Sequence, residues 1–211
     1  MLTLAMDTAA VIGSIALADP RGVIAETRLE APGGFGQVLF REIEALLARA
    51  KVRLADIELY AAASGPGSFT GVRIGLAAIK GLAEVAGKPA VGISNLEALA
   101  QFGSAGLRAP VIDARRGEVF AALLDSDGTE VIPASVLRFS EFVALVGDRS
   151  VEYISADFDP GVPVTSAPVE LAGMIARLAI ARCVSGVLCD PATMEANYVR
   201  RSDAEVFWKP V

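Results

Sequence analysis

The chain has 211 residues, a formal net charge of −6, 53% hydrophobic residues and no histidine. The acidic balance argues against a protein that binds nucleic acid on its own, because such proteins usually carry a basic face. The lack of histidine removes the commonest general base and the commonest metal ligand. No apolar stretch runs for about 18 residues without a charge, so we expect no membrane partner.

Both the N-terminus and the cysteines favour a cytoplasmic protein. Residues 1–7 contain no basic leader before a long apolar run, so we expect no export signal. Cys183 and Cys189 are the two cysteines, and their spacing matches neither a redox pair nor a zinc site. We therefore expect two unrelated thiols in a reducing compartment.

The first half of the chain mixes strands and helices. Apolar runs bounded by turn residues predict strands, and the Asp-Pro-Arg-Gly turn at 19–22 predicts an antiparallel meander. Apolar residues at helical spacing predict helices, with Ser94 and Glu97 as a capping box. The expected strands are 2–6, 13–18, 23–29, 59–63 and 89–93, and the expected helices are 39–50, 72–86 and 95–102.

The second half repeats the pattern of the first. Each half places an aspartate, Asp7 or Asp113, at the end of a strand, then a second strand and a turn closed by glycine. This weak internal repeat predicts an α/β protein of two lobes that face each other across a cleft, where ligands tend to bind. We expect an N-terminal lobe at 1–105 and a smaller C-terminal lobe at 106–211, whose last segment packs back on the first lobe.

A glycine-rich segment at 64–75 is the most informative stretch, and it reads Ser-Gly-Pro-Gly-Ser-Phe-Thr-Gly-Val-Arg-Ile-Gly. Between a strand and a helix, such a segment can hold an anion through backbone N–H groups, with Gly67 and Ser68 as candidate nucleotide contacts. The segment is neither a Walker A loop nor the dinucleotide fingerprint. A tight turn with Thr70 as the helix N-cap is the competing interpretation.

Two more pairs of residues at strand ends are candidate nucleotide contacts, Asp7 with Thr8 and Asp113 with Arg115. The two aspartates could hold magnesium, which leaves open a stand-alone magnesium-dependent nucleotide phosphohydrolase. Turn aspartates bonded to local N–H groups are the simpler interpretation. Ser68 is a poor candidate nucleophile, because the chain has no histidine to act as its base.

The helix expected at 72–86 is apolar on two faces, one containing Ile79 and the other Leu82. One face covers the sheet, and the other needs a neighbouring helix or a partner chain. Gly75 and Gly81 lower the stability of the helix, a cost that close packing against a neighbouring helix offsets.

The run at 65–75 resembles the bacterial TsaB (YeaZ) family, which takes part in making threonylcarbamoyladenosine next to the anticodon of tRNAs. Met-Asp-Thr-Ala at 6–9, Ile-Asp-Ala-Arg-Arg-Gly-Glu-Val-Phe at 112–120 and Asn-Tyr-Val-Arg-Arg at 197–201 agree with it in the same order. The resemblance implies a duplicated actin-like, Hsp70-like and sugar-kinase-like fold of the ribonuclease H-like type, with a mixed sheet flanked by helices in each lobe.

The resemblance also implies a role without catalysis. Family members are similar to the catalytic subunit TsaD, a threonylcarbamoyltransferase, but lack its metal-binding histidines. They act as obligate partners that activate TsaD and work with the ATPase TsaE, and tRNA is reached indirectly through the complex. We expect no tightly bound cofactor and no metal, with ATP or ADP at a joint surface at most. A homodimer in isolation and a glycopeptidase-like hydrolase remain as alternatives.

Within this resemblance the helices of the first lobe form the partner interface. We expect Gly75→Glu or Ile79→Arg to abolish the heterodimer with little loss of folding. The expected interface residues are Phe35, Leu39, Ile43, Val72, Arg73, Gly75, Leu76, Ile79 and Lys80.

Overall fold

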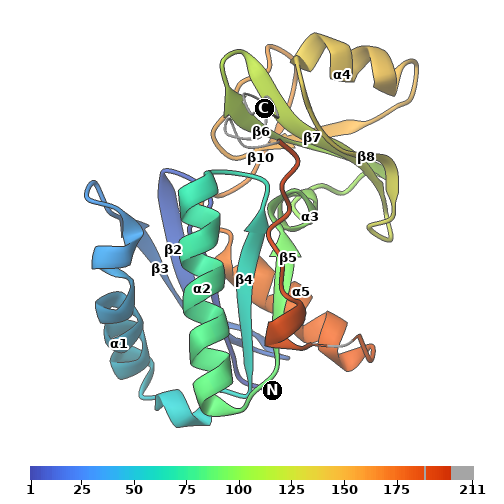
Figure 1. Cartoon of the computed structure of the whole chain (residues 1–211). Helices are drawn as coiled ribbons and strands as arrows, with labels where there is room; N and C mark the ends of the chain where they lie inside the picture. The colour runs from blue at the N-terminus through green and yellow to red at the C-terminus, as the bar shows by residue number, and fades with distance from the viewer. Residues whose placement is uncertain (188, 201–211) are drawn as a thin grey trace, which may run out of the picture.

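The computed structural model describes residues 1–187 and 189–200, and within them the chain forms two sheets of five strands each. The strands of the first sheet and the helices on one of its sides come from the first half of the chain (Figure 1). Its strands are β1 (Thr3–Asp7), β2 (Ile12–Asp19), β3 (Gly22–Glu30), β4 (Leu59–Gly65) and β5 (Ala90–Ser94). The helical segments between them are η1 (Phe35–Gln37), α1 (Leu39–Ala50), η2 (Leu54–Asp56) and α2 (Phe69–Ala86), and α3 (Asn95–Ala100) follows β5.

The second half of the chain forms the other sheet and returns to the first (Figure 1). Its strands are β6 (Leu107–Arg115), β7 (Glu118–Asp125), β8 (Glu130–Leu137), β9 (Glu152–Ser155) and the short β10 (Thr165–Ser166). Its helical segments are α4 (Phe139–Val146), α5 (Ala172–Val184) and η3 (Pro191–Thr193). The described helices are all too short or too polar to span a membrane.

The two sheets share one topology, which confirms the internal repeat. The first has the order β3-β2-β1-β4-β5 and the second the order β8-β7-β6-β9-β10. In each, three antiparallel strands come first, and the fourth then pairs in parallel with the first of them. The predicted mixed sheets, and the antiparallel meander at the start of the chain, are therefore present.

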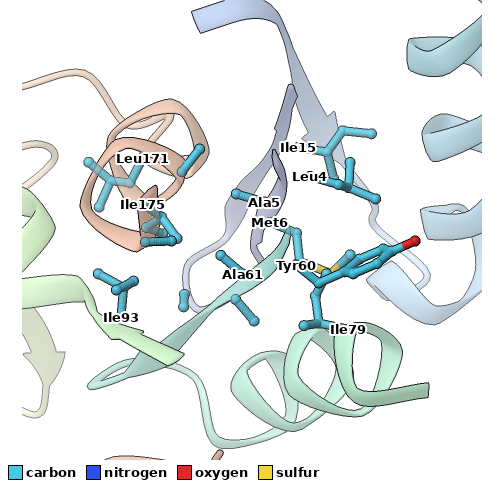
Figure 2. Packing of buried hydrophobic residues seen from close by; sticks show 14 of the residues in the cluster. Leu4, Ala5, Met6, Ile15, Tyr60, Ala61, Ile79, Ile93, Leu171 and Ile175 are labelled. Carbon is cyan, nitrogen blue, oxygen red and sulfur yellow. The ribbon is translucent and has the colours of Figure 1, made fainter. Parts of the chain in front are cut away.

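The first sheet is covered on both sides, so its central strands are buried on both faces. Ile79 of α2 lies on one side of β1 and β4, and Leu171 and Ile175 at the start of α5 lie on the other (Figure 2). Ala5 and Ala61 are neighbours in register on these two strands and are fully buried. Each large apolar side chain buried in this way contributes about 1.5–3 kcal/mol relative to exposure.

Helix α5 belongs to the second half of the sequence, yet it packs on β1, β2 and β4 of the first sheet. Its first two N–H groups are capped from that sheet: Ala172 N donates to Ser14 Oγ at 2.9 Å and Gly173 N donates to Glu26 Oε1 at 2.9 Å. The boundary between lobes at residues 105 and 106 stays a prediction.

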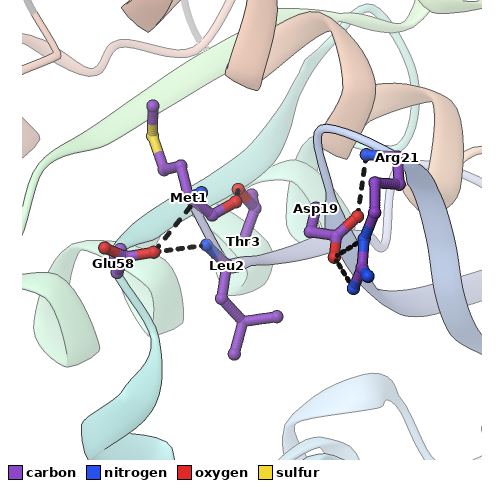
Figure 3. A network of polar contacts seen from close by, with 6 residues as sticks. All are labelled: Met1, Leu2, Thr3, Asp19, Arg21 and Glu58. Carbon is purple, nitrogen blue, oxygen red and sulfur yellow. Dashed lines mark hydrogen bonds and ion pairs between the residues drawn. The ribbon is translucent and has the colours of Figure 1, made fainter.

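Polar contacts hold the start of the chain and the first turn. Glu58 accepts a hydrogen bond from Leu2 N at 2.7 Å and lies 3.5 Å from the N-terminal ammonium group (Figure 3). Asp19 pairs with Arg21 at 2.6 Å across the turn that joins β2 to β3 (Figure 3). Residues 19–22 therefore form the turn that the sequence predicted between these two strands.

The expectation of two unrelated thiols is wrong. Cys183, in the last turn of α5, forms a disulfide with Cys189, and their Cα atoms are 6.2 Å apart. The turn after α5 brings them together, with Gly186 in the left-handed region at φ 85°. Cysteine usage therefore no longer supports a reducing compartment.

Candidate functional site

The loop after β1 packs directly on the glycine-rich segment. Ser68 N donates a hydrogen bond to Ala9 O at 2.6 Å, and Thr8 Oγ1 donates one to Gly71 O at 2.7 Å. Thr8 is buried. These contacts place four of the candidate nucleotide positions, Asp7, Thr8, Gly67 and Ser68, at one edge of the first sheet.

Glycine is needed in this segment because the β1 loop approaches so closely. A Cβ atom at Gly67 would overlap the carbonyl oxygen of Ala9, and one at Gly71 would overlap that of Thr8. A Cβ atom at Gly75 would lie 2.6 Å from Thr8 Oγ1. The glycines thus allow contact between α2 and the chain's own backbone.

Ser68, rather than Thr70, is the N-cap of α2. Its Oγ accepts a hydrogen bond from Gly71 N at 3.2 Å. The expected cap at Thr70 is wrong, because the helix starts at Phe69, three residues before the start expected from the apolar pattern. The Ser68 hydroxyl is therefore used in capping the helix.

Asp7 is buried in a small polar network at the same edge, with 1% of its surface exposed. Its Oδ1 accepts from Ala9 N at 2.8 Å and its Oδ2 accepts from Asn95 Nδ2 at 3.0 Å. Asn95 Oδ1 in turn accepts from Gly65 N at 3.0 Å. Burial raises the pKa of Asp7 above its ordinary value, although the two hydrogen bonds act against that rise.

Asn95 was missed from the sequence, although a signal for it was present. It directly follows β5, as Thr8 directly follows β1, and these strands are parallel to β4. Polar residues at the ends of strands that run the same way meet at one edge of the sheet. Both oxygens of the buried Asp7 carboxylate accept a hydrogen bond from the chain itself, one from Ala9 N and one from Asn95 Nδ2.

The second-lobe candidates pair with each other. Arg115 N donates to Asp113 Oδ1 at 2.7 Å, and its guanidinium lies 3.0 Å from Asp113 Oδ2. Arg115 and Arg116 have φ values of 64° and 58°, which form the turn between β6 and β7. Asp113 thus has the geometry of a turn aspartate. Within residues 1–187 and 189–200, no group of three acidic or cysteine side chains could hold a metal ion.

The apolar residues expected at the partner interface lie in the core instead. The sequence pattern showed which residues share a helix face, but that face turns toward the sheet. Gly75→Glu and Ile79→Arg would therefore disrupt folding, which corrects the expectation that folding survives them. The buried members are Phe35, Leu39, Ile43, Val72, Gly75, Leu76 and Ile79.

Arg73 and Lys80, the two charged members of the expected interface, bind the C-terminal segment of the chain. Arg73 Nε donates to the Tyr198 hydroxyl at 2.7 Å, and Lys80 Nζ donates to Met194 O at 3.0 Å. We call residues 189–200 the C-terminal strap. In Figure 1 it is the dark red segment that rises beside β5 toward the second sheet.

The outward side of α1 and α2 carries a second apolar surface. Phe40 is 55% exposed on α1 and Val85 is 92% exposed on α2. Ala77 and Gly81 of α2 are also exposed, and no atom lies within 4 Å of the place where a Gly81 Cβ would stand. Both helices cover the same side of the first sheet (Figure 1). We call Phe40, Ala77, Gly81 and Val85 the outer face.

The sequence of the chain matches proteins of one tRNA-modification family. A family model described as "TsaD: tRNA N6-adenosine threonylcarbamoyltransferase" matches residues 31–168. The "tRNA threonylcarbamoyladenosine biosynthesis protein TsaB" of Bacillus subtilis (strain 168) is 32% identical over 164 residues, which cover 74% of this chain and 72% of that protein. The chain belongs to the TsaB (YeaZ) family.

Further comparisons agree with this assignment. The TsaB protein of Escherichia coli (strain K12) is 39% identical over 132 residues, which cover 60% of this chain and 56% of that one. The solved structure described as "YeaZ from Pseudomonas aeruginosa" is 25% identical, with a TM-score of 0.73 and coverage of 91% and 96%. The resemblance of the sequence to TsaB and the duplicated actin-like fold are both confirmed.

Proposed function

We propose that this TsaB-family chain is a non-catalytic subunit that binds and activates a TsaD-type threonylcarbamoyltransferase, for modification of the adenosine next to the anticodon in tRNAs. A TsaE-type ATPase works with the pair, and ATP or ADP binds at a surface shared with these partners. Membership of the family supports this role. So do the lack of histidine in the sequence and the burial of Asp7, which leave few groups for independent catalysis.

The observation that carries the proposal is the outer face of α1 and α2. A glycine within a helix costs about 1 kcal/mol relative to alanine, and Gly81 gains no packing within the chain to offset this cost. Val85, about one helical turn after Gly81, exposes apolar surface beside it. A partner helix seated over Gly81 would approach closely and bury the Val85 side chain, which makes this face suited to a partner protein.

The buried residues of α1 and α2 have a supporting role in this proposal. Leu39, Ile43 and Ile79 fix the two helices on the sheet, so that the outer face keeps one shape before the partner binds. A rigid face lowers the ordering cost of association. When the partner is absent, a second copy of this chain binds the same face.

The proposal is tested by reconstitution of threonylcarbamoyl transfer to tRNA with TsaD-type and TsaE-type proteins of the same organism. We expect transfer to require this chain. Full transfer by the other two proteins alone contradicts the proposal, and so does ATP hydrolysis by this chain alone that is lost in Asp7→Ala.

The role of the outer face is tested with Val85→Asp and Gly81→Arg. Both positions are exposed, so we expect folding to survive and the complex to be lost in size-exclusion chromatography with light scattering. Val184→Asp is the matched control, because Val184 is exposed on α5, on the other side of the sheet. Intact complexes in both outer-face variants contradict the proposed surface.

A further inference from the structure

An exposed cluster of aromatic and cationic side chains lies where the C-terminal strap crosses the first turns of α2. The Arg73 guanidinium carbon lies 3.6 Å from the centre of the Phe69 ring, and Arg73 Nε donates to the Tyr198 hydroxyl at 2.7 Å. The rings of Phe69 and Tyr198 are 5.3 Å apart. Phe69 is 41% exposed and Tyr198 49% exposed, so ring surface remains accessible.

The strap extends this cluster to the second lobe. Arg200, two residues after Tyr198, donates through Nη1 to Ala114 O at 3.0 Å and pairs with Glu118. Arg115 is exposed in the neighbouring turn. Two residues of extended chain span at most about 7 Å, so the backbone of Arg200 lies close to that of Tyr198. We call Phe69, Arg73, Arg115, Tyr198 and Arg200 the junction patch.

The charge of the junction patch is opposite to that of the chain as a whole. Acidic residues exceed basic ones in the sequence, 25 against 19. The patch instead has the guanidinium groups of Arg73, Arg115 and Arg200 beside two carboxylates, those of Asp113 and Glu118. The described contacts of Arg73 are to an aromatic ring and a hydroxyl, so no described carboxylate offsets its charge.

This combination of groups suits single-stranded RNA. Exposed aromatic rings stack on unpaired bases, and guanidinium groups bind phosphates or stack on bases in the same way. Stacking on Phe69 and the bond to Tyr198 hold Arg73 in place before a ligand arrives. Tyrosine and arginine also occur at protein interfaces, but the local excess of positive charge on an acidic chain favours a polyanion.

We propose that the junction patch binds the anticodon arm of the tRNA substrate, with Phe69 and Tyr198 against loop bases and Arg73 and Arg115 against phosphates. The proposal rests on the proposed function, which supplies tRNA as the substrate. It adds a direct contact between this chain and RNA at the junction of the lobes.

The test uses the assembled complex and a fluorescently labelled anticodon stem-loop RNA, with affinity measured over a range of salt concentrations. Each phosphate contact that is lost should lower the magnitude of the salt slope by about 0.7. We expect Arg73→Gln and Arg115→Gln to weaken binding several-fold and to reduce this slope. Phe69→Ala should weaken binding by about tenfold with less change in the slope, because it removes stacking.

Two further variants separate RNA binding from loosening of the strap. Tyr198→Phe removes the hydrogen bond that positions Arg73 but keeps the ring, so it should weaken RNA binding less than Phe69→Ala does. Arg53→Gln removes an exposed arginine at η2 and should leave affinity and slope unchanged. Wild-type affinity and slope in Arg73→Gln and Arg115→Gln complexes overturn the proposal. So does a loss of RNA binding in Tyr198→Phe equal to that in Phe69→Ala.

A measurement on the chain alone distinguishes a failure of the junction patch proposal from a failure of the proposed function. If no complex with the TsaD-type protein forms, the proposed function fails, and the patch is tested by ultraviolet cross-linking of the same RNA to the isolated chain at low salt. Cross-links at Phe69 or Tyr198 support the patch, and cross-links confined to other residues overturn it. Loss of complex assembly in Arg73→Gln overturns it as well, because the patch then binds protein.

Discussion

The side-chain amide of Asn95 donates a hydrogen bond to the buried carboxylate of Asp7, with 3.0 Å between Nδ2 and Oδ2. Because Asn95 Oδ1 also accepts from Gly65 N, one side chain joins the end of β1, the start of α3 and the glycine-rich segment. The polar groups that resemble a nucleotide site are here bonded to one another.

The first prediction concerns Asn95. Asn95→Ala should lower the free energy of unfolding by about 2–4 kcal/mol, because it leaves Gly65 N and Asp7 with unpaired buried groups. Asn95→Asp should lower it further at pH 7, and by less at a lower pH at which one of the two facing carboxyl groups is protonated. Urea unfolding at both pH values measures these differences. Gln101→Glu, at the end of α3, is the charge-matched control, and Asn95→Asp with wild-type stability at pH 7 contradicts the network.

The second prediction concerns the pH dependence of stability. Burial raises the pKa of Asp7 above its ordinary 3.8 in the folded chain. As pH rises above 3.8, the unfolded chain loses this proton first, so the free energy of unfolding falls until pH passes the folded pKa. Asp7→Asn should remove this fall, and a plot of unfolding free energy against pH should be flatter over that window. If Asp7→Asn leaves the slope of this plot unchanged, the pKa of Asp7 is not raised in the folded chain.

The third prediction compares two glycines of α2. Gly71→Ala should lower the free energy of unfolding by about 3 kcal/mol, because its Cβ overlaps the Thr8 carbonyl. Gly81→Ala should raise it by about 1 kcal/mol, because its Cβ stands in open space and alanine favours the helix. Thermal unfolding measures both. Equal effects of the two changes would refute the difference in packing.

The fourth prediction concerns Tyr60, whose side chain is fully buried beside Ile79 (Figure 2). Its hydroxyl has no hydrogen-bond partner among the described residues. Tyr60→Phe should therefore raise the free energy of unfolding by about 1 kcal/mol, since it removes a desolvated hydroxyl and keeps the ring. Chemical denaturation measures the change, and a loss of stability would show that the hydroxyl is bonded.

The fifth prediction concerns the disulfide between Cys183 and Cys189. Closure of so short a loop should contribute about 2 kcal/mol by limiting the unfolded chain. The double variant Cys183→Ser with Cys189→Ser should lose that amount, and dithiothreitol should destabilise the wild type but not the variant. Thiol titration of the denatured protein without reductant should find no free thiol, and two free thiols contradict the bond.

The elements of the fold could be predicted where a pattern is local. The apolar spacing of 39–50 gave the bounds of α1, and the turn residues at 19–22 located the join of β2 and β3. The repeat of aspartate, strand and glycine turn predicted that the two halves of the chain share one topology. The pair of residues in β10 has no such pattern, because its pairing with β9 is set by the sheet.

The other features could not be predicted from local patterns, because they depend on tertiary contacts. Helical spacing identified Leu76 and Ile79 as one face of α2, but which face meets the sheet depends on packing. The roles of Gly67 and Gly71 depend on the β1 loop, which lies about sixty residues earlier in the chain. Family resemblance identified the segment, and the structure supplied the reason for its glycines.

The position of α5 bears on how the chain folds during synthesis. Domains generally fold from the N-terminus as the ribosome releases them. Here one side of the first sheet stays uncovered until residue 184 has been made, because α5 is its cover. Contacts this distant in sequence slow folding, since a long loop must close before they form. The nascent first half therefore exposes apolar strands to aggregation or to chaperones until nearly the whole chain has emerged.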